Sequence, residues 1–573
     1  MTRTPVITRE RPESVITRER SDRGICSCDR REKSRSLASL VMAASGRSLV
    51  MTLTLAVACT GSAGRAGPSD DLLIVGYDRE PDTMNRYATH ILEDIQSCVV
   101  EGLVTSDEKM NVVPVLAAEI PTQENGGVKL RADGGMDVIW KLRPGVKWHD
   151  GHPHTSADIK FTVDAINKGD WKPESTDGFD RIASVDTPDS LTAVVHYKEV
   201  YAPYQMQFFR GTLPKHVLEG RDIDKANDYN RNPLGTGPFR VAEWKTGEHV
   251  LLEKVPTYWR GTAYPKINRI LFRFISNTTT RINQLKTGEV HVVALVPWDK
   301  VREIKTVPTI RLNEVLGNGY EHVTLNEKHF PPFADVRVRR ALAHAIDRDL
   351  LVKTILDGLV TTVNGPIQPL SWAYEPNVKR YDFDPARART ILDSAGWKPG
   401  ADSIRAKDGK PLAFTIITQS GFAIRENVAQ TLQRQFKDVG VNASVKLIDG
   451  TSISSVWFAG EFDAMLHWWQ SGADPEITLF FAKDRTPPAG RNINYFADDS
   501  LTTLLYASDR TVDQAKRKEL LRHAQVRVAE LVPELPLYNT AKIDAVPAAM
   551  RGFKGNPTNA GPFWNVYEWD IGK

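Results

Sequence analysis

Cysteine is scarce in this chain, which has only 4 Cys among 573 residues. Cys26 and Cys28 lie in an N-terminal segment that we expect to be removed, and Cys59 is the predicted site of a lipid. Cys98 is then left alone in the apolar run SCVVEGLV, so the mature chain cannot form an intrachain disulfide. About 500 residues bury ample core without one, and this length favours two or three domains. We expect Cys98 to pack as a small hydrophobic side chain.

Long apolar runs are also scarce. The run SLVMTLTLAVA, Ser48–Ala58, is too short to span a bilayer, which needs ~20 apolar residues. It follows Arg47 and leads into Cys59, a pattern typical of an export signal. The small residues before Cys59 resemble a lipoprotein signal, in which a lipid on the thiol holds the protein at a membrane surface. Ordinary secretion with soluble release is the alternative.

The segment before this signal has few large apolar residues. It repeats VITRER at 6–11 and 15–20 amid dense charge, a composition that cannot bury a core. We therefore predict a non-native or disordered extension over 1–41, translation from Met42, and a signal peptide over 42–58. The Gly-, Ser- and Ala-rich residues 59–71 are predicted to be a flexible tether.

No excess of one charge remains in the mature chain. Met1–Ala58 hold 11 Lys and Arg against 6 Asp and Glu, so 63 of the 74 basic residues and 65 of the 71 acidic residues follow them. The formal charge after removal is therefore about −2, although the pI of the whole chain is 8.4. This balance gives no overall basic bias toward nucleic acid or anionic lipid, and we predict no nucleic-acid partner.

Familiar catalytic motifs are absent from the sequence. It contains no H-E-x-x-H, no G-x-S-x-G and no Gly-rich phosphate loop of the usual spacing. A triad assembled from distant residues would leave no such trace, so an exported hydrolase stays an alternative. Nothing in the sequence favours it, and we predict that the protein is not an enzyme.

Strand and helix patterns are present along the rest of the chain. The run DLLIVGY, 71–77, predicts a short buried strand, and VVEGLVTSD and VIWKLRPGVKW predict further strands. Apolar residues recur at helical spacing over 335–359, where Arg337, Arg340 and Arg348 are expected on a solvated face. Asp384, Pro385 and Gly396 mark the start and end of another helix.

The clearest unit is a strand at 412–418, a helix at 423–439 ended by Gly440, and a strand at 441–448. This order predicts a parallel right-handed crossover and therefore an α/β fold. Ligands in open α/β sheets lie beyond the carboxyl ends of the strands. The loop after Ile448 and its neighbours should therefore face a cleft.

Six segments together resemble a family, the extracellular solute-binding proteins of ATP-driven (ABC) importers, in the branch of oligopeptide- and dipeptide-binding proteins. They occur in the family's order and run from Trp140 to Tyr538. The segments are WKLRPGVKWHDGHPHTSADIKFT, PLGTGPFRVAEWKTGE, RINQLKTGEV, FADVRVRRALAHAID, DPARARTILDSAGW and PELPLY.

The resemblance implies a bilobal periplasmic-binding-protein-like α/β fold with two hinged lobes. Lobe I would span 72–316, with an inserted subdomain at about 102–231, and the chain would return to it over 537–573. Lobe II would span 317–536, so that two crossings near 317 and 537 form the hinge. The lobes of such a protein close on a bound solute.

The resemblance also implies ligand-binding positions. Peptide binders of the family place a Trp and, three residues later, an Asp that pairs with the peptide's amino group. In HWWQSGADP these positions are Trp468 and Ser471, so the carboxylate that would pair with the amine is missing. Asp474 could substitute, or the ligand could lack an amine. Because neighbouring strand residues point to opposite faces, we expect one of Trp468 and Trp469 in the core and the other at the ligand.

Further candidates come from lobe I and the crossings. Glu93 and Asp94 precede VVEGL, where the family lets an edge segment pair with ligand backbone, and a solvated loop is the alternative. Tyr320 and Tyr538 lie near the two crossings and are also predicted ligand-binding residues.

The cluster WHDGHPH holds His149, Asp150, His152 and His154, which are metal-ligand types. Asp-Gly is also hairpin-turn chemistry, and metal ligands normally converge from several elements. We therefore favour a turn, and we predict no metal ligand and no cofactor.

The resulting hypothesis is an importer receptor that captures an oligopeptide or a similar extended polar solute and delivers it to membrane permease subunits. We expect a monomer, lipid-anchored at the membrane and located in the periplasm or on the cell surface. The sequence leaves peptide, oligosaccharide, opine and metal chelate open as ligands. A lipid-anchored sensor or chaperone of the same fold is the alternative function.

Overall fold

The computed structural model describes residues 72–89, 93–169, 171, 173, 176, 178–450 and 452–572. The predicted extension, signal peptide and tether, including Cys59, lie outside these residues. No helix within the described ranges combines the length and apolar character that crossing a bilayer requires.

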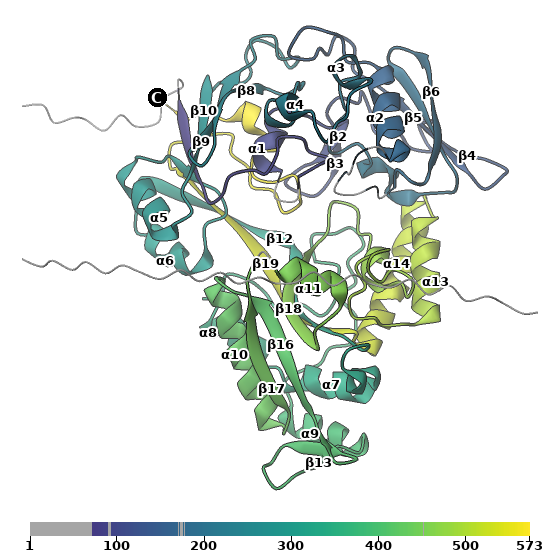
Figure 1. Cartoon of the computed structure of the whole chain (residues 1–573), viewed down its shortest axis with the longest axis vertical. Helices are drawn as coiled ribbons and strands as arrows, with labels where there is room; N and C mark the ends of the chain where they lie inside the picture. Colours follow the sequence, from purple (N-terminus) through teal and green to yellow (C-terminus); the bar gives the residue numbers. More distant parts are fainter. Residues whose placement is uncertain are drawn as a thin grey trace, which may run out of the picture. The chain divides into compact units, whose positions relative to one another are not determined.

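A ten-stranded sheet runs through the described chain in the order β17-β16-β18-β12-β19-β11-β1-β10-β9-β8 (Figure 1). β1 confirms the strand predicted at 71–77, and it pairs in parallel with β10 and β11. In the sheet's order, the strands are Asn442–Ile448, Ala413–Gln419, Ala464–Gln470, Ile310–Leu325, Glu534–Pro547, Val292–Val293, Leu73–Tyr77, Arg269–Phe274, His249–Lys254 and Phe239–Lys245.

β12 and β19 are the longest strands and run antiparallel beside each other through the middle of this sheet (Figure 1). Their pairing is interrupted between Leu316 and Tyr320. A Cβ atom on Gly317 would lie 2.4 Å from Thr540 Oγ1, and one on Gly319 would lie 2.6 Å from the Trp469 carbonyl oxygen. The backbone contact at Gly319 excludes any larger residue, whereas a Cβ atom at position 317 would require the Thr540 side chain to rotate. The predicted crossing near 317 lies on β12, and the one near 537 lies on β19.

A second sheet has four strands in the order β4-β5-β7-β6. Helix α2, Ser156–Lys168, packs on it, and the shared core includes Trp140 and Phe208. Apart from Tyr87, the buried residues of this core come from between Leu103 and Tyr229, within the predicted insert. The four strands are Val128–Leu130, Met136–Lys141, Thr192–Tyr197 and Ile182–Asp189. The remaining short strands are β2 (Val104–Ser106), β3 (Val112–Pro114), β13 (Lys398–Pro399), β14 (Arg405–Lys407) and β15 (Lys410–Pro411).

The predicted strand–helix–strand unit is confirmed. β16 and β17 are parallel, and α10, Ala423–Asp438, connects them. Gly440 follows the helix with φ +82°, a conformation that glycine adopts without strain. β18 lies on the other side of β16, also in parallel. The carboxyl ends of three neighbouring strands therefore share one edge of the sheet.

Helices cover both faces of this part of the sheet. α7 (Val336–Ala345), α9 (Pro385–Ser394) and α10 share one core with it, and α13 (Asp499–Asp509) and α14 (Gln514–Leu531) share the core on the other face. The other helices are α1 (Asp94–Ser97), α3 (Lys215–Leu218), α4 (Asn227–Arg231), α5 (Thr278–Thr287), α6 (Val301–Ile304), α8 (Arg348–Thr354), α11 (Ile453–Ala459) and α12 (Thr478–Phe481).

The helical pattern over 335–359 forms two helices, α7 and α8, with a break between them. Ile346 is extended, with φ −96° and ψ 119°, and the Asp347 carboxylate accepts a hydrogen bond from the Leu350 N–H at 2.9 Å to begin α8. The pattern predicted the buried face but not the break, because Asp347 competes for backbone hydrogen bonds locally.

The solvated arginine face predicted for this segment is wrong for two of its three residues. The Arg348 guanidinium donates to the carbonyls of Pro536 and Tyr381, and burial lowers its pKa to about 10. Arg340 donates to the Glu530 carbonyl, and of the three only Arg337 is exposed, to 47%. These side chains therefore join loops and helices of the fold.

Two local predictions are confirmed. Asp384 caps α9 by accepting from the Arg387 N–H at 2.8 Å, and Gly396 ends the helix with φ +89°. Cys98 is fully buried, and this burial raises its thiol pKa well above the ordinary value. A buried neutral thiol of this kind is inert.

Candidate functional site

A row of three side chains crosses the sheet near the carboxyl end of β18. Trp468 on β18 lies opposite Glu321 on β12, and Glu321 lies opposite Tyr538 on β19. Residues directly opposite each other project from the same face of an antiparallel pair. The Tyr538 ring in turn contacts that of Trp298, with centroids 6.3 Å apart. Two predicted ligand-binding residues, Trp468 and Tyr538, are thus brought into one row, but Tyr538 is only 1% exposed and belongs to the core.

Arg425 in the first turn of α10 completes this row with a charge. Its guanidinium contacts the Glu321 carboxylate through Nη2–Oε1 at 2.8 Å and Nε–Oε2 at 2.9 Å, and both side chains are largely buried. Burial alone would lower the Arg425 pKa, but the Glu321 charge raises it above its usual range. The pair places a fixed dipole beside Trp468.

Exposed apolar side chains gather around the same edge of the sheet. Trp468 is 39% exposed and Phe422 before α10 is 46% exposed. The Arg425 guanidinium lies 5.1 Å from the centroid of the Phe422 ring. Exposed aromatic groups beside a buried ion pair suit contacts with the apolar parts of a polar ligand. We call Trp468, Glu321, Arg425 and Phe422 the edge site.

Trp469 and Tyr320 project from the opposite face of the sheet. Trp469 is 8% exposed and packs on Phe480, with ring centroids 4.6 Å apart. Tyr320 is buried, and its hydroxyl donates to Glu534 Oε1 at 2.5 Å. One Trp of the pair is therefore in the core and the other at the surface, as expected from strand alternation.

The segment after β18 carries the other two candidates, Ser471 and Asp474. Ser471 is held through its backbone, since its N–H donates to the Asn318 carbonyl at 3.2 Å. Both carboxylate oxygens of Asp474 are bound by Arg517, at 2.5 and 2.7 Å. The Asp474 charge is therefore already neutralised by a buried guanidinium.

The lobe I candidates Glu93 and Asp94 also have partners. The Glu93 carboxylate contacts Arg86 Nε at 2.8 Å and Arg210 Nε at 2.7 Å. Asp94 is buried and accepts from the Tyr77 hydroxyl at 2.5 Å, and burial raises its pKa despite that hydrogen bond. Both side chains fix the α1 region, so a ligand would meet backbone there.

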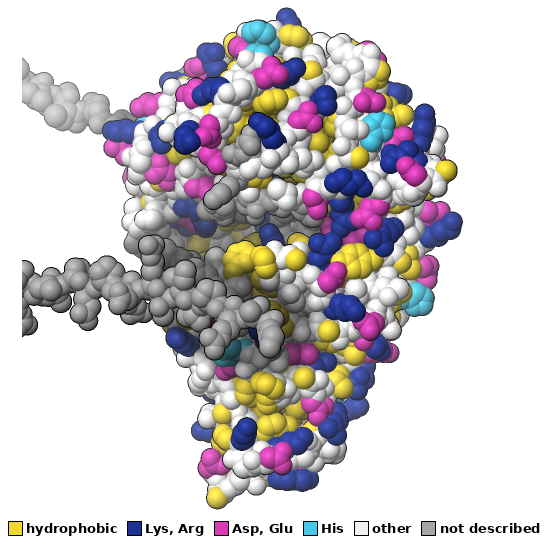
Figure 2. Space-filling model, turned by 45° about the vertical axis from the view of Figure 1, so that its right-hand side comes forward, with side chains coloured by type: hydrophobic (Ala, Val, Ile, Leu, Met, Phe, Trp, Pro, Cys, Tyr) yellow, Lys and Arg dark blue, Asp and Glu magenta, His cyan; other side chains and the backbone are white. Residues whose placement is uncertain are grey.

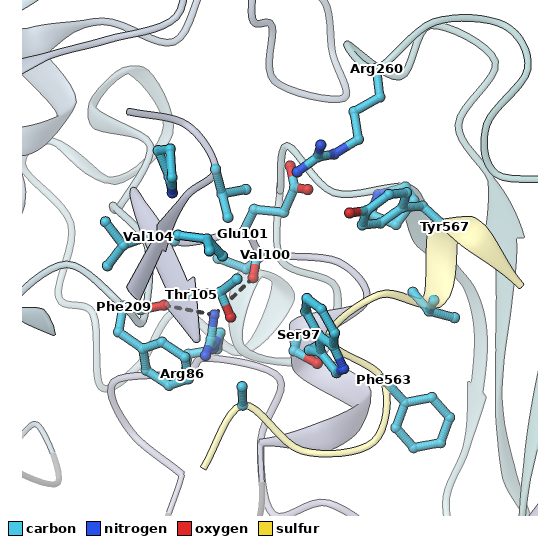
Figure 3. A pocket seen from close by; sticks show the side chains of 18 residues that line it. Arg86, Ser97, Val100, Glu101, Val104, Thr105, Phe209, Arg260, Phe563 and Tyr567 are labelled. Atoms are coloured by element: carbon cyan, nitrogen blue, oxygen red, sulfur yellow. Dashed lines mark hydrogen bonds between the residues drawn. The ribbon is translucent and has the colours of Figure 1, made fainter. Parts of the chain in front are cut away.

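A cavity of about 230 Å³ adjoins α1 (Figure 3). Figure 3 shows the Glu101 carboxylate turned toward the Arg260 guanidinium at one end and Arg86 bonded to backbone carbonyls at the other. Glu101 accepts from the Tyr258 hydroxyl and from Trp259 Nε1, both at 2.6 Å, and burial raises its pKa. The cavity is lined mainly by apolar side chains, and its charged groups, Arg86, Glu101 and Arg260, already have partners.

The edge site contains residues that the sequence analysis missed. Glu321 is next to the predicted Tyr320, and strand alternation could have placed the two on opposite faces. Arg425 and Phe422 follow the predicted strand 412–418, at the carboxyl edge where ligands bind.

The turn predicted at Asp150–Gly151 is confirmed. The Trp148 N–H donates to the His152 carbonyl at 2.8 Å, and Gly151 has φ +91°. His149 and His154 bind elsewhere, to the Gly237 carbonyl and the Thr212 hydroxyl, both at 3.0 Å. The four-residue metal set is therefore not brought together.

The visible surface carries both charge signs. In Figure 2, Lys and Arg side chains lie among Asp and Glu side chains over this face, without a broad area of one sign. This pattern agrees with the near-zero formal charge of residues 59–573.

Residues 111–486 match the family model described as bacterial extracellular solute-binding proteins, family 5 Middle. The chain is 28% identical over 552 residues to the oligopeptide-binding protein AppA of Bacillus subtilis, a match that covers 92% of this chain and 98% of AppA. It is 25% identical over 461 residues to the glutathione-binding protein GsiB of Pectobacterium atrosepticum, covering 79% and 85%.

Solved structures similar to this chain are also solute-binding proteins of this kind. The structure of AppA from Bacillus subtilis with a nonapeptide has a TM-score of 0.75 and 27% identity, covering 88% of this chain and 99% of AppA. That of NikZ from Campylobacter jejuni with Ni(L-His) has a TM-score of 0.76 and 26% identity, covering 88% and 100%. The predicted bilobal α/β fold is confirmed.

Proposed function

The chain belongs to the bacterial extracellular solute-binding proteins, family 5. From this membership we propose that it is the substrate-binding receptor of an ATP-driven importer and that it captures an oligopeptide. AppA, similar over nearly its whole length, is an oligopeptide-binding protein whose structure holds a nonapeptide. The observation that carries the proposal is the exposed Trp468 side chain beside the buried Arg425–Glu321 pair near the carboxyl ends of β16 and β18.

The edge site would act by packing and by charge. Trp468 and Phe422 offer apolar surface to ligand side chains, and the Arg425–Glu321 pair lies beside them with its orientation fixed. A peptide in extended form presents side chains and backbone polar groups alternately, so such a surface matches its repeat. Closing of the two lobes would remove water from these contacts.

The site has no carboxylate prepared for a peptide's amino terminus. Ser471 stands where peptide binders of the family have Asp, and Asp474 is bound through both oxygens by Arg517. An ammonium bound at Ser471 would therefore lack a charge-assisted partner there. We propose that this receptor holds peptides mainly through backbone and side chains, with little dependence on a free amino group.

Delivery requires a partner in the membrane. In this proposal the loaded monomer docks on permease subunits, and the ligand is released without any bond being made or broken. A lipid on Cys59 would keep the receptor outside the cell and close to the permease. The family description places such proteins outside the cytoplasm.

Calorimetry on the purified mature chain tests this function. A library of five- to nine-residue peptides should give saturable heat, and acetylated and free-amine forms of one bound peptide should have similar affinities. A Ni²⁺–histidine chelate, the kind of ligand in the NikZ structure, serves as the comparison ligand. Binding of the chelate with no heat from any peptide would contradict the oligopeptide assignment, and turnover of a peptide would contradict the receptor role.

A further inference from the structure

Three side chains of metal-ligand type meet on the surface of the 102–231 region. His152 Nδ1 lies 3.0 Å from Asp150 Oδ2, and His216 Nε2 lies 2.9 Å from the same oxygen. The two imidazole rings are stacked with centroids 4.3 Å apart. One ligand atom from each of the three residues lies within 4.8 Å of the other two. His216 is 66 positions from Asp150 in the chain, so the sequence gives no local sign of this group.

Both segments that carry these residues are fixed by the fold. The turn is closed by the Trp148–His152 backbone hydrogen bond, and the His152 N–H donates to Asp150 Oδ1 at 3.0 Å. The Trp148 side chain is buried below the turn, with its ring centroid 6.3 Å from that of His216. The carboxylate and the two imidazoles are therefore positioned before any ligand arrives.

The other end of the group is anchored through α3. The Lys215 N–H at its start donates to Asp158 Oδ1 at 3.0 Å, and Leu218 at its end is buried. Asp158 in turn belongs to the first turn of α2. His216 therefore projects from a short helix that is tied to a longer one.

The spacing fits the first coordination sphere of a small divalent ion. A tetrahedral Zn²⁺ with ligands at about 2.0–2.1 Å needs ligand atoms roughly 3.3 Å apart. Two of the three separations, 2.9 and 3.0 Å, reach this value with small side-chain rotations, and the third is no longer than 4.8 Å. All three side chains reach solvent, so an ion can enter and a water molecule can occupy the fourth position.

We propose that Asp150, His152 and His216 form a surface site for a divalent transition-metal ion, of the Zn²⁺, Ni²⁺ or Cu²⁺ class. Two imidazoles and one carboxylate suit these ions better than Ca²⁺ or Mg²⁺, which take oxygen ligands. The ion would join the turn after Trp148 to α3. The site is separate from the edge site and does not depend on the proposed peptide function.

Calorimetry with ZnCl₂ and NiCl₂ on the mature chain, purified without a histidine tag, tests the proposal. We expect one ion per chain, and His152→Ala and His216→Ala should each weaken the affinity at least about tenfold. CaCl₂ should give no saturable heat. The proposal would be overturned if neither Zn²⁺ nor Ni²⁺ bound saturably. It would also be overturned if a variant carrying both His152→Ala and His216→Ala kept the parent's affinity.

His329→Ala is the matched control. His329 is also exposed, and its Nδ1 lies 2.8 Å from Asp463 Oδ1, but it belongs to no group of three metal-ligand side chains among the described residues. Its replacement should leave metal affinity unchanged. Circular dichroism of each variant should match the parent, because the three replaced side chains are exposed. An equal loss of affinity in His329→Ala would assign the binding to surface histidines in general and reject the three-residue site.

Discussion

The Asn318 side chain donates from Nδ2 to the Gly472 carbonyl at 2.8 Å, which ties the interrupted part of β12 to the segment after β18. The Asn318 carbonyl also accepts from the Ser471 N–H at 3.2 Å. The segment at the predicted ammonium position therefore depends on the predicted crossing for its conformation.

Asn318→Ala should loosen this segment. Loss of a buried hydrogen bond that leaves its carbonyl partner without the amide costs about 1–3 kcal/mol, so the free energy of unfolding in urea should fall by this amount. Peptide affinity should fall as well, because the segment after β18 would become less ordered. Asn377→Ala, at an exposed turn, is the control and should change neither quantity.

Trp468 and Trp469 should respond differently to replacement. Trp469→Ala removes a core side chain and should lower the free energy of unfolding by about 3–5 kcal/mol. Trp468→Ala should lower it by only about 1 kcal/mol. Peptide affinity of the folded Trp468 variant should drop at least about tenfold, measured by calorimetry. Unchanged affinity in that variant would mean that the edge site does not contact the ligand.

The Arg425–Glu321 pair should be more important for stability than an exposed pair of the same type. Glu321→Ala leaves a buried guanidinium without its carboxylate and should destabilise the fold by about 3–5 kcal/mol. Glu253→Ala breaks the exposed Arg240–Glu253 pair and should cost about 1 kcal/mol or less. Similar losses of unfolding free energy in both variants would contradict a special role for the buried pair.

Glu534 should make stability depend on pH. Burial raises its pKa from 4.5 to about 8, although the Tyr320 hydrogen bond opposes the shift. Between these values the folded protein keeps a proton on Glu534 that the unfolded chain has released, so the contribution of Glu534 to stability falls as the pH rises. Between about pH 5 and pH 8, the free energy of unfolding of Glu534→Gln should therefore fall by roughly 2–4 kcal/mol less than that of the parent.

Urea unfolding at the two pH values measures this difference. Glu119→Gln is the control, because Glu119 is 46% exposed in its pair with Lys141. It should follow the parent at both pH values. If Glu534→Gln lost as much stability as the parent between the two pH values, the raised pKa of Glu534 would be contradicted.

Cys59→Ser should release the protein from membranes. The predicted signal attaches a lipid to the Cys59 thiol, and a hydroxyl cannot take its place. Fractionation of cells that express the full chain should find the parent with membranes and the variant in the soluble extracellular or periplasmic fraction. Mass spectrometry of the mature N-terminus should detect the lipid only in the parent. An unmodified parent would support ordinary secretion.

The elements were predictable where a local pattern decides them. β16, α10 and β17 follow from apolar runs, helical spacing and Gly440, and α9 follows from its cap residues. The opposite directions of Trp468 and Trp469 follow from the geometry of a strand. Each of these depends on neighbours within a few positions.

The pairings at the site were not predictable in this way. Glu321 and Arg425 lie 104 positions apart, and Asp474 and Arg517 lie 43 positions apart. The order of strands in the sheet decides which charged side chains meet. Local patterns in one sequence do not reveal that order. The same reason hid His216, because its approach to Asp150 depends on how α3 packs beside the turn.

β12 and β19 pair on both sides of the interruption at Gly317–Gly319, so they form one ribbon that belongs to both parts of the main sheet. A two-stranded ribbon twists easily about its long axis but keeps its length. If the two parts of the sheet rotate relative to each other when ligand binds, the rotation axis must therefore run close to Thr540 and these glycines. A cross-link that stiffens the ribbon there would slow uptake without touching any residue that meets the cargo.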